Sequence, residues 1–402
     1  MKDHQSNILI IGAGVIGLAI ARELKERNPE QSITLIEKEP HLAFHGSGRN
    51  SGVLHAGFYY TANSLKAQFT RDGNRLLHAY CQEKNIRVNP CQKVVVAQNE
   101  EELAGLHELE SRGKVNGVDV RLIDLNELAE IDPNVQTYQK ALFSPTTATV
   151  DPAEVCRAIQ KDLEAQRVEI LFNESYARRM DDHTIQTVSG RRYQAEKIIN
   201  CAGLYADKVA KDFGFSQDYT IIPFKGIYLK YTKPDQPIRT CIYPVPNLKN
   251  PFLGVHYTIT VDNTIKIGPT AIPAFWRENY QKFDRFDMNE FLEILYQEAR
   301  LFAANAFNFR ALAFEEVQKY YKPYFVGLAT SMVKQIDTKG FTEWSKPGIR
   351  AQLLNTKTMA LVQDFVVEGD EKTIHVLNAV SPAFTCSFPF AKWVVERYIA
   401  TP

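Results

Sequence analysis

The sequence predicts an α/β fold in which a doubly wound sheet is combined with a second domain built on a mixed or antiparallel sheet plus helices. Three observations lead to this prediction. An apolar strand, a glycine-rich turn, an amphipathic helix and a second apolar strand follow one another between residues 7 and 37, which is the unit that builds a parallel sheet. Another apolar strand ends in an Ala-Gly pair at 196–203. Between 219 and 268, aromatic and β-branched residues alternate with Pro and Gly turns, a pattern typical of antiparallel strands.

The other elements follow from hydrophobic periodicity and from residues that start or stop helices. For example, Asp151 is a candidate N-cap residue, and the proline after it occupies the first position of the predicted helix. Strands and turns typical of a nucleotide-binding domain lie at both ends and in the middle of the chain. Each of the two domains is therefore expected to consist of segments that alternate along the sequence. The expected segments are 1–90, 145–218 and 340–402 for the first domain, and 91–144 and 219–339 for the second. Helices are predicted at 18–27, 65–84, 100–112, 152–167, 286–309 and 315–330 and after 382, and further strands at 93–98 and 373–377.

Composition excludes several classes of protein. Lys and Arg together number 47, as do Asp and Glu, so the 402 residues carry no formal net charge. A nucleic-acid-binding surface, which needs a basic excess, is therefore not expected. The six cysteines lack CxxC spacing, which favours free thiols in a reducing compartment over a disulfide framework or a metal site. The apolar run at 8–20 contains three glycines and is shorter than the roughly 20 residues of a membrane span, so we expect a cytoplasmic protein, with peripheral attachment to the inner face of a membrane left open.

A dinucleotide-binding fingerprint stands at the N-terminus. Gly12-Ala13-Gly14-Val15-Ile16-Gly17 matches GxGxxG between a strand and a helix, and Glu37, followed by Lys38, ends the next strand 20 residues after Gly17. Glycines let the backbone approach a pyrophosphate at a helix N-terminus, and the acid accepts hydrogen bonds from ribose hydroxyls. A plain tight turn and an ordinary strand-end acid are the alternatives. In combination these features predict dinucleotide binding, although they do not distinguish FAD from NAD.

A second glycine-rich loop follows soon after, with the sequence Gly46-Ser47-Gly48-Arg49-Asn50-Ser51-Gly52. Its small residues could wrap a pyrophosphate and approach a ring system, while composition by itself is equally compatible with a flexible surface loop. The order of GxGxxG, acid and SGRNSG resembles the flavin-dependent D-amino-acid oxidase superfamily, which includes glycerol-3-phosphate dehydrogenase. Within that superfamily, the stretch from 47 to 60 (SGRNSGVLHAGFYY) and SLKA at 64–67 resemble the L-2-hydroxyglutarate oxidase/dehydrogenase family.

The resemblance continues in order through most of the chain. It includes NCAG at 200–203, CIYPVPNLKNPFLGVHY at 241–257, IGP at 267–269, Trp344, GIRAQ at 348–352, DF at 364–365 and HVLNAVSP at 375–382. It implies a Rossmann-like domain that binds FAD. The contacts that it implies, beyond those of the fingerprint, come from Ser47, Gly48, Arg49, Asn50, Ser51, Gly52, Cys201, Ala202, Gly203, Arg350, Asn378, Pro382 and Ala383.

The resemblance also implies a reaction. The expected activity is oxidation of a small anionic 2-hydroxy acid, with L-2-hydroxyglutarate as the leading substrate, by hydride transfer to the flavin and reoxidation by a quinone, a respiratory-chain acceptor or oxygen. Such chemistry needs a cation for the carboxylate and a base for the hydroxyl proton. Two alternatives stay open. One is a superfamily oxidase of an amino acid, a secondary amine or glycerol 3-phosphate, and the other is a non-catalytic flavin-binding scaffold.

Four residues are the catalytic candidates. Arg350 could grip a carboxylate with two parallel hydrogen bonds, or it could be a structural arginine close to the flavin. His256, as an imidazole that titrates near neutrality, suits a general base, against the alternative of a structural histidine. His55 is the other candidate base, or it positions the cofactor, and covalent attachment of flavin to a histidine is not decided. Lys66 could bind the second carboxylate of a diacid, or it could be a solvated helix lysine.

Some positions depart from the pattern expected of relatives. Lys225-Gly226-Ile227-Tyr228 replaces an expected Arg-Gly-Asp/Glu-Tyr, and Thr270 replaces an asparagine. Lys225 and Tyr228 are further candidates for anion contacts, unless they face outward from their strand. The segment 378–384 should present a helix N-terminus, whose dipole would stabilise negative charge on a reduced flavin. Phe384 stands where a small residue is expected, and Pro389 is expected to interrupt or kink the last helix.

Overall fold

The computed structural model describes residues 4–62, 64–246 and 252–399. Residues 247–251, in the middle of the 241–257 motif, lie outside that description. The chain forms two compact units, each assembled from segments far apart in the sequence. Unit 1 comprises Met1–Asn50, Pro152–Pro223 and Arg350–Pro402, and unit 2 comprises Ser51–Asp151 and Phe224–Ile349.

The boundaries of the units differ from those of the expected domains, chiefly because residues 51–90 belong to unit 2. Long-range pairing is the reason. Strand β3 (Val53–Leu54) pairs antiparallel with β7 (Ala148–Thr149). Asn74 Nδ2 donates hydrogen bonds to the carbonyl oxygens of Leu54, at 3.0 Å, and Thr146, at 3.2 Å. These contacts hold the second glycine loop's C-terminal end and the helix after it within unit 2.

Unit 1 is built on a mostly parallel sheet with the strand order β21-β22-β11-β1-β2-β8. The pairs along the path from β22 to β8 are parallel, and β21 adds an antiparallel edge. The predicted strand 33–37 is β2, and four of its five residues are buried, as expected of a strand covered on both faces. The strands of unit 1 are β1 (His4–Ile11), β2 (Ile33–Glu37), β8 (Glu169–Phe172), β9 (Tyr176–Arg179), β10 (Thr184–Thr187), β11 (Arg192–Asn200), β19 (Gly348–Asn355), β20 (Ala360–Leu361), β21 (Val366–Gly369) and β22 (Thr373–Asn378).

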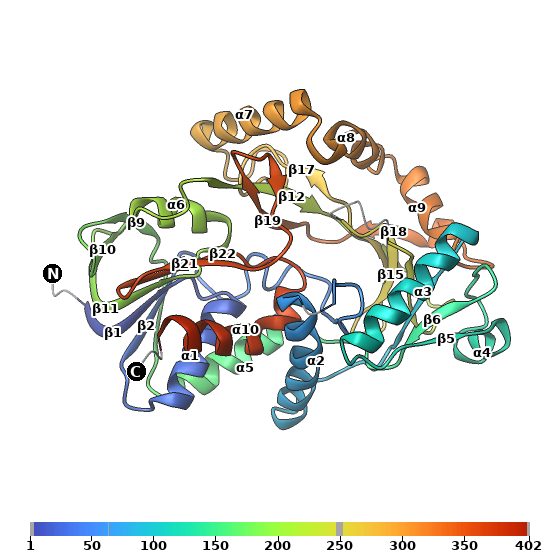
Figure 1. Ribbon diagram of the computed structural model, residues 1–402, viewed down its shortest axis with the longest axis horizontal. Helices are drawn as coiled ribbons and strands as arrows, with labels where there is room; N and C mark the ends of the chain where they lie inside the picture. The colour runs from blue at the N-terminus through green and yellow to red at the C-terminus, as the bar shows by residue number, and fades with distance from the viewer. Residues whose placement is uncertain (1–3, 63, 247–251, 400–402) are drawn as a thin grey trace. The chain divides into compact units, whose positions relative to one another are not determined.

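Helices cover both faces of this sheet. Figure 1 shows α1 (Val15–Arg27), α5 (Pro152–Ala165) and α10 (Ala383–Tyr398) on one face, and α6 (Ala206–Asp212) on the other. The short 3₁₀ helix η1 (Gly203–Tyr205) leads into α6. Helix α1 begins three residues earlier than expected, directly after the second fingerprint glycine. Helix α10 continues through Pro389, so the expected interruption is wrong. The doubly wound architecture predicted from the sequence is confirmed.

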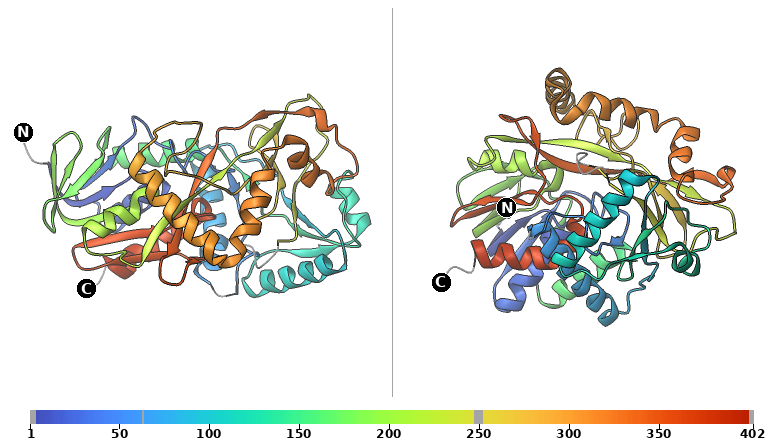
Figure 2. Two further views of the ribbon diagram at one scale, coloured as in Figure 1. Left: turned by 90° about the horizontal axis from the view of Figure 1, so that it is seen from above. Right: turned by 45° about the vertical axis from the view of Figure 1, so that its right-hand side comes forward.

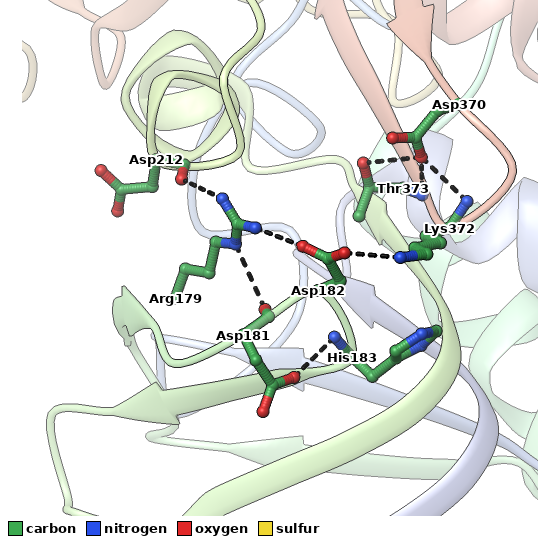
Figure 3. A network of polar contacts seen from close by, with 8 residues as sticks. All are labelled: Arg179, Asp181, Asp182, His183, Asp212, Asp370, Lys372 and Thr373. Carbon is green, nitrogen blue, oxygen red and sulfur yellow. Dashed lines mark hydrogen bonds and ion pairs between the residues drawn. The ribbon is translucent and has the colours of Figure 1, made fainter.

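Polar contacts join two hairpins at one end of this sheet (Figure 3). Asp182, between β9 and β10, accepts a hydrogen bond from Lys372 Nζ at 2.6 Å and pairs with Arg179. Asp370 accepts from the backbone N–H of Lys372 at 2.8 Å and from that of Thr373 at 2.7 Å. The ion-paired side chains are about half exposed, so the network orders the hairpins more than it stabilises the fold, because exposed pairs contribute at most about 1 kcal/mol each.

Unit 2 has a mixed sheet with the strand order β18-β13-β16-β15-β14-β4-β6-β5. Its neighbours are antiparallel except β14 and β4, which run parallel. A large apolar core lies on this sheet, with Val94, Val95 and Leu142 fully buried. The strands not yet given are β4 (Lys93–Val96), β5 (Arg121–Ile123), β6 (Ala141–Ser144), β13 (Leu229–Tyr231), β14 (Cys241–Pro244), β15 (His256–Ile259), β16 (Ile265–Gly268), β17 (Ile272–Pro273) and β18 (Phe341–Trp344), together with β12 (Tyr219–Gly226), in which the chain passes from unit 1 to unit 2.

The helices of unit 2 include a consecutive series after β17. The expected helix at 315–330 is instead two, α8 and α9, with a break after Gln318. Pro323 explains the break, because proline is tolerated in the first turn of a helix but not in its interior. Figure 2 shows this series in orange. The helices are α2 (Leu65–Glu83), α3 (Glu100–Val115), α4 (Leu125–Ile131), α7 (Met288–Ala304), α8 (Phe309–Gln318) and α9 (Lys322–Thr330), and the 3₁₀ turns are η2 (Ala306–Asn308) and η3 (Thr338–Gly340).

None of the helices in the described part of the chain combines the length and the apolar character needed to cross a bilayer.

Candidate active site

The fingerprint loop of unit 1 brings the backbone of three segments close together. Gly12 has φ +101°, and a Cβ atom there would lie 2.5 Å from the carbonyl oxygen of Cys201. A Cβ on Gly17 would lie 2.1 Å from the carbonyl oxygen of Gly12. Only glycine fits either position, because real Cβ atoms do not approach backbone atoms so closely. The turn therefore places the start of α1 directly beyond the end of β1, next to the end of β11.

Helix α1 presents its N-terminus at this turn. Its N-cap is Gly14, which provides no side-chain cap among the described residues. The backbone N–H of Val15 donates to Ser47 Oγ at 2.9 Å, so the second glycine loop reaches the same helix end. Backbone N–H groups and the helix dipole make such a terminus a site for a phosphate group. Five predicted cofactor contacts, namely Gly12, Gly14, Val15, Ile16 and Gly17, form this turn.

Glu37 closes the other side of the turn. Its Oε2 accepts a hydrogen bond from the Ala13 N–H at 3.0 Å, and its Oε1 accepts from the Glu39 N–H at 3.0 Å. Burial raises the pKa of Glu37, and the two backbone N–H groups oppose that rise. Each carboxylate oxygen retains a lone pair after one hydrogen bond, so Glu37 can still accept from ribose hydroxyls. Lys38, the residue after it, pairs instead with Glu39 at 3.0 Å.

The second glycine loop is ordered by its own side chains. Arg49 Nε donates to the carbonyl oxygen of Phe44 at 2.6 Å. Asn50 Nδ2 donates to the carbonyl oxygens of Gly46 and Ser47, at 3.2 and 2.9 Å. A Cβ on Gly48 would lie 2.0 Å from the carbonyl oxygen of Ala43. The loop is therefore a built turn rather than a flexible connection, and Gly48 is required by its packing within the protein.

The residues that follow β11 lie next to the fingerprint turn. Asn200 Oδ1 accepts from the Ala202 N–H at 3.1 Å, and its Nδ2 donates to the Ala206 carbonyl oxygen at 2.8 Å. Gly203 then adopts φ +55°. Asn200 also lies 3.2 Å from Nδ1 of His375 on β22. Asn200 and His375 thus hold the predicted contacts Cys201, Ala202 and Gly203 in place. The sequence analysis includes both residues in family motifs but predicts no supporting role for them.

The segment after β22 contains the predicted helix N-terminus, but the side chain of the predicted cofactor contact Asn378 binds within the protein. Helix α10 begins at Ala383, and Pro382 is its N-cap without a side-chain cap among the described residues, so a helix N-terminus stands close to where the sequence predicts one. The Asn378 side chain is engaged within unit 1. Its Nδ2 donates to the carbonyl oxygens of Val362, at 3.2 Å, and Asp364, at 2.6 Å, and its Oδ1 accepts from the Leu353 N–H. Both side-chain donors of Asn378 are therefore used within unit 1, and only Oδ1 and the backbone keep hydrogen-bonding capacity for a cofactor.

These features fit an FAD diphosphate and ribose. The fingerprint glycines allow the close packing that places a helix N-terminus at this turn, and the half-buried carboxylate of Glu37 keeps acceptor capacity for ribose hydroxyls. Arg350 lies in unit 1, at the start of its last segment on β19. The remaining catalytic candidates, His55, His256 and Lys66, lie in unit 2 together with Ser51 and Gly52.

Unit 2 gathers cationic and aromatic side chains around Tyr243. The ring of His256 stacks on that of Tyr243 with 3.7 Å between ring centroids. Lys93 Nζ lies 4.1 Å from the same ring's centroid. Burial lowers the pKa of both His55 and His256, and the charge of Lys93 lowers each of them further. The structure thus brings the two candidate bases, His55 and His256, into one electrostatic environment.

His256 is held in the tautomer that a base requires. Its Nδ1 lies 2.8 Å from the carbonyl oxygen of Gly254. A carbonyl oxygen can only accept a hydrogen bond, so Nδ1 carries the hydrogen and Nε2 has a lone pair. Burial, reinforced by the charges of Lys93 and Lys266, lowers the pKa of His256 to about 3. The pKa of His256 in the protein by itself therefore lies below the usual range of a histidine, because the imidazole is buried near two lysines.

Three other candidates are more buried than the alternatives assumed. Lys66 has only 6% of its surface exposed and is no solvated helix lysine. Lys225 is also buried and donates to Asn279 Oδ1 at 3.3 Å, so it does not face outward. Burial raises the pKa of Tyr228 well above its usual range. The ammonium group of Lys266 lies 4.6 Å from the centroid of the Tyr228 ring and 3.4 Å from the Ser51 carbonyl oxygen.

The comparisons with known proteins agree over almost the whole chain. The family model described as "FAD dependent oxidoreductase" matches residues 7–397. An L-2-hydroxyglutarate dehydrogenase of Escherichia coli (strain K12) is 34% identical over 397 residues, covering 97% of this chain and 92% of the relative. The mitochondrial L-2-hydroxyglutarate dehydrogenase of Homo sapiens is 34% identical over 418 residues, covering 97% of this chain and 88% of the relative.

Solved structures show the same fold at lower identity. An L-α-glycerophosphate oxidase from Mycoplasma pneumoniae with FAD bound has a TM-score of 0.76 and 21% identity, covering 98% of this chain and 94% of its own. A glycine oxidase from Geobacillus kaustophilus has a TM-score of 0.71 and 18% identity, covering 99% and 96%. Together with the full-length family match and the nucleotide turn of unit 1, these likenesses identify the chain as an FAD-dependent oxidoreductase that belongs to the family of the L-2-hydroxyglutarate dehydrogenases.

Proposed function

We propose that the protein oxidises L-2-hydroxyglutarate to 2-oxoglutarate. The observation that carries the proposal is the group of His55, His256, Lys93 and Lys266 in unit 2, where two candidate bases lie near the buried amine of Lys93 and the half-buried amine of Lys266. A 2-hydroxy acid needs a base for its hydroxyl proton and a positive charge for its carboxylate. The relatives that share about a third of their residues with this chain over its whole length are named for this substrate.

Residues of unit 1 would bind the cofactor, and residues of unit 2 would accept the proton of the substrate. In unit 1, the fingerprint turn and Glu37 would hold the diphosphate and ribose of FAD, and in unit 2, His256 Nε2 would take the hydroxyl proton. Bound FAD supplies an acceptor for the hydride that leaves the carbon bearing that hydroxyl. His55 is the second candidate for the base. Lys66 and Arg350 remain candidates for binding a carboxylate.

A substrate panel tests the proposal. We expect anaerobic mixing of the holoenzyme with L-2-hydroxyglutarate to bleach its visible flavin absorbance, and the D-isomer to leave it unchanged, because hydride transfer requires one face of the reacting carbon. The panel includes amino acids, a secondary amine and glycerol 3-phosphate. Bleaching by one of these and not by L-2-hydroxyglutarate would contradict the proposed substrate in favour of another superfamily oxidase. A flavoprotein that none of them reduces would be a non-catalytic flavin-binding protein.

We further propose that the electrons leave to a membrane-bound acceptor of the quinone type. An FAD-dependent dehydrogenase needs an acceptor, and one surface of unit 2 suits docking to a bilayer. Helix α7 buries Ile294 and Leu301 together with Glu290 and Glu298 on one face, and it exposes a second apolar face that includes Leu292 and Tyr296. The solvent-facing side of a helix in a water-soluble protein is normally polar. The exposed apolar side chains of this segment, here called the α7–α8 surface, are Phe275, Phe283, Phe286, Met288, Leu292, Leu295, Tyr296, Phe302, Phe314, Val317, Tyr320 and Tyr321.

The composition of the α7–α8 surface favours a lipid interface. Aromatic residues predominate, with Phe283 81% and Tyr321 68% exposed. The cations Lys282, Arg285 and Arg310 are exposed in the same segment, together with the acids Asp284, Asp287 and Glu315. Aromatic rings next to Lys and Arg are typical of elements that lie in the headgroup region of a membrane.

Vesicle binding tests this surface. We expect the holoenzyme to sediment with vesicles that contain anionic phospholipid, and a Leu292→Ser/Tyr296→Ser variant to stay largely in the supernatant, because each substitution removes apolar area from the interface. Leu125→Ser is the matched control, since Leu125 is 53% exposed on α4, outside this surface. Equal sedimentation of wild type and double variant would contradict the membrane proposal, as would a dimer that forms through this surface without vesicles.

A further inference from the structure

Lys93 has a position that is costly for a cation. It is the first residue of β4, has no measurable exposure, and its Nζ has no hydrogen-bond partner among the described residues. Transferring an ammonium group from water to a protein interior is expensive unless an opposite charge or hydrogen bonds compensate. Burial lowers the pKa of Lys93 to about 8, so much of the population still carries the charge near neutrality. The neighbouring thiols of Cys241 and Cys91 oppose this fall in the pKa only in part, so an anion beside Lys93 would stabilise its charged form.

The surroundings of Lys93 supply weak compensation. Its ammonium group lies 4.1 Å from the ring centroid of Tyr243, 5.4 Å from that of Tyr59 and 5.7 Å from that of Phe58. Aromatic faces attract a cation, although by less than a carboxylate does. No aspartate or glutamate among the described residues forms an ion pair with it. The titratable groups around it are His55, Tyr59, Cys91, Cys241, Tyr243 and His256.

We infer that Lys93 binds the substrate carboxylate next to the reacting carbon. The proposal rests on the proposed function only in requiring that the substrate be a small carboxylic acid. Lys93 and His256 both contact the ring of Tyr243, with Lys93 Nζ 4.1 Å and the His256 centroid 3.7 Å from the Tyr243 centroid. In a 2-hydroxy acid, the carboxylate carbon is bonded directly to the carbon that bears the hydroxyl. The strand order β15-β14-β4 places Tyr243 between His256 and Lys93, and the charge of Lys93 acts on both His55 and His256. A carboxylate held at Lys93 would therefore keep the hydroxyl-bearing carbon in the electrostatic environment of the two candidate bases.

The same contact would couple binding to catalysis. In the protein by itself, the positive charge of Lys93 disfavours protonation of His256. A bound carboxylate compensates that charge, so the basicity of His256 rises when the substrate is present. His256 would then become a stronger base when the substrate is bound.

Replacement by methionine provides the test. Lys93→Met keeps the length and apolar volume of the side chain and removes the charge, and Lys230→Met is the matched control, because Lys230 lies on β13 of the same sheet in a partly exposed ion pair with Glu343. We expect the Kd of the holoenzyme for 2-oxoglutarate, measured by titration calorimetry, to rise about 30-fold or more in Lys93→Met, as for removal of one partner of a buried charge pair. The control should change the Kd by about twofold at most, as for an exposed pair.

The pH dependence gives a second readout that a structural lysine would not produce. Binding to the wild type should weaken as the pH rises through about 8, because the ammonium form of Lys93 is lost. This weakening should be smaller in Lys93→Met. The variant should also retain its flavin with an unchanged or higher Tm, because removing an unpaired buried charge tends to stabilise a fold.

The outcomes separate this inference from the proposed function. A Lys93→Met holoenzyme that binds 2-oxoglutarate as tightly as the wild type overturns the inference and leaves the proposed function intact. If the substrate panel identifies a different acid, the same titration uses that acid's oxidation product. If Lys93→Met loses its flavin, Lys93→Gln, which retains hydrogen-bond donors without the charge, is measured instead. Loss of fold and flavin in both variants, without a selective loss of binding, overturns the inference in favour of a structural lysine.

Discussion

His256→Asn is expected to slow substrate-dependent flavin reduction by about 10²-fold or more, the usual contribution of a general base. The structure gives the physical reason. Gly254 fixes the tautomer of His256 through Nδ1, and Nε2 is left as the proton acceptor. Asparagine can reproduce the hydrogen bond to the Gly254 carbonyl oxygen but cannot accept a proton at neutral pH, so binding should suffer less than the rate of reduction. Rapid mixing of the holoenzyme with L-2-hydroxyglutarate measures that rate.

Two further variants make the His256 result specific. His78→Asn is the control, because His78 is another partly buried histidine of unit 2 that lies on α2 and has no assigned role in the site. His55→Asn examines the second candidate base. A large loss in His55→Asn combined with an unchanged rate in His256→Asn would remove His256 from the mechanism and assign the base to His55.

The pH dependence of kcat/KM should reflect the unusual environment of these groups. His256 has a pKa of about 3 in the free protein, so it stays neutral and competent as a base far below the usual histidine value of about 6.5. No acidic limb is therefore expected near pH 6.5 in kcat/KM. Lys93 must be protonated to bind an anion, so kcat/KM should fall as the pH rises above about 8. The acidic limb of kcat should lie at higher pH than that of kcat/KM, since a bound carboxylate raises the pKa of His256.

Much of the fold follows from local sequence signals. Strand β2 matches its predicted bounds, and α5 begins at Pro152 as expected, because an apolar β-branched run and a proline after an N-cap residue are local features. Residues 51–90 belong to a different unit from the one expected, for the opposite reason. Strand β3 pairs with β7, almost a hundred residues further along, and no local pattern in a loop of glycine and small polar residues encodes that partner.

The residue types of the candidate site could be predicted from the sequence, but the burial and the charged neighbours of those residues could not. The glycines, Glu37 and the histidines were found because their residue types and spacing indicate chemistry. Lys93 was missed, because a lysine that begins a strand such as Lys-Val-Val-Val usually has its side chain exposed to solvent. A sequence signal was present, because Cys91, two residues before Lys93, and the three valines after it are apolar. The pairing of β4 with Cys241 on β14 is long-range and could not be predicted from the local pattern. The low pKa of His256 also could not be predicted, since it depends on burial and on lysines 163 residues before and 10 residues after it in the sequence.

Gly12→Ala is expected to abolish retention of FAD and to destabilise unit 1 by about 2 kcal/mol or more, as for a side chain forced into a left-handed backbone conformation. At φ +101°, the added Cβ would lie 2.5 Å from the Cys201 carbonyl oxygen, which belongs to the backbone and cannot rotate away. The end of β11 would have to move away from the turn at the start of α1. That movement would widen the place where the diphosphate is expected to lie.

Gly46→Ala separates this effect from a general sensitivity of the glycine loops. A Cβ on Gly46 meets nothing within 4 Å, so this variant should keep its flavin and its Tm. The measurements are the ratio of flavin to protein absorbance after purification and the shift of Tm on adding FAD. Added ligand raises Tm only when the folded protein binds it, so the shift should be present in wild type and Gly46→Ala and absent in Gly12→Ala. A Gly12→Ala protein that purifies with full flavin content would show that this turn does not hold the diphosphate, and the assignment of the cofactor to unit 1 would have to be withdrawn.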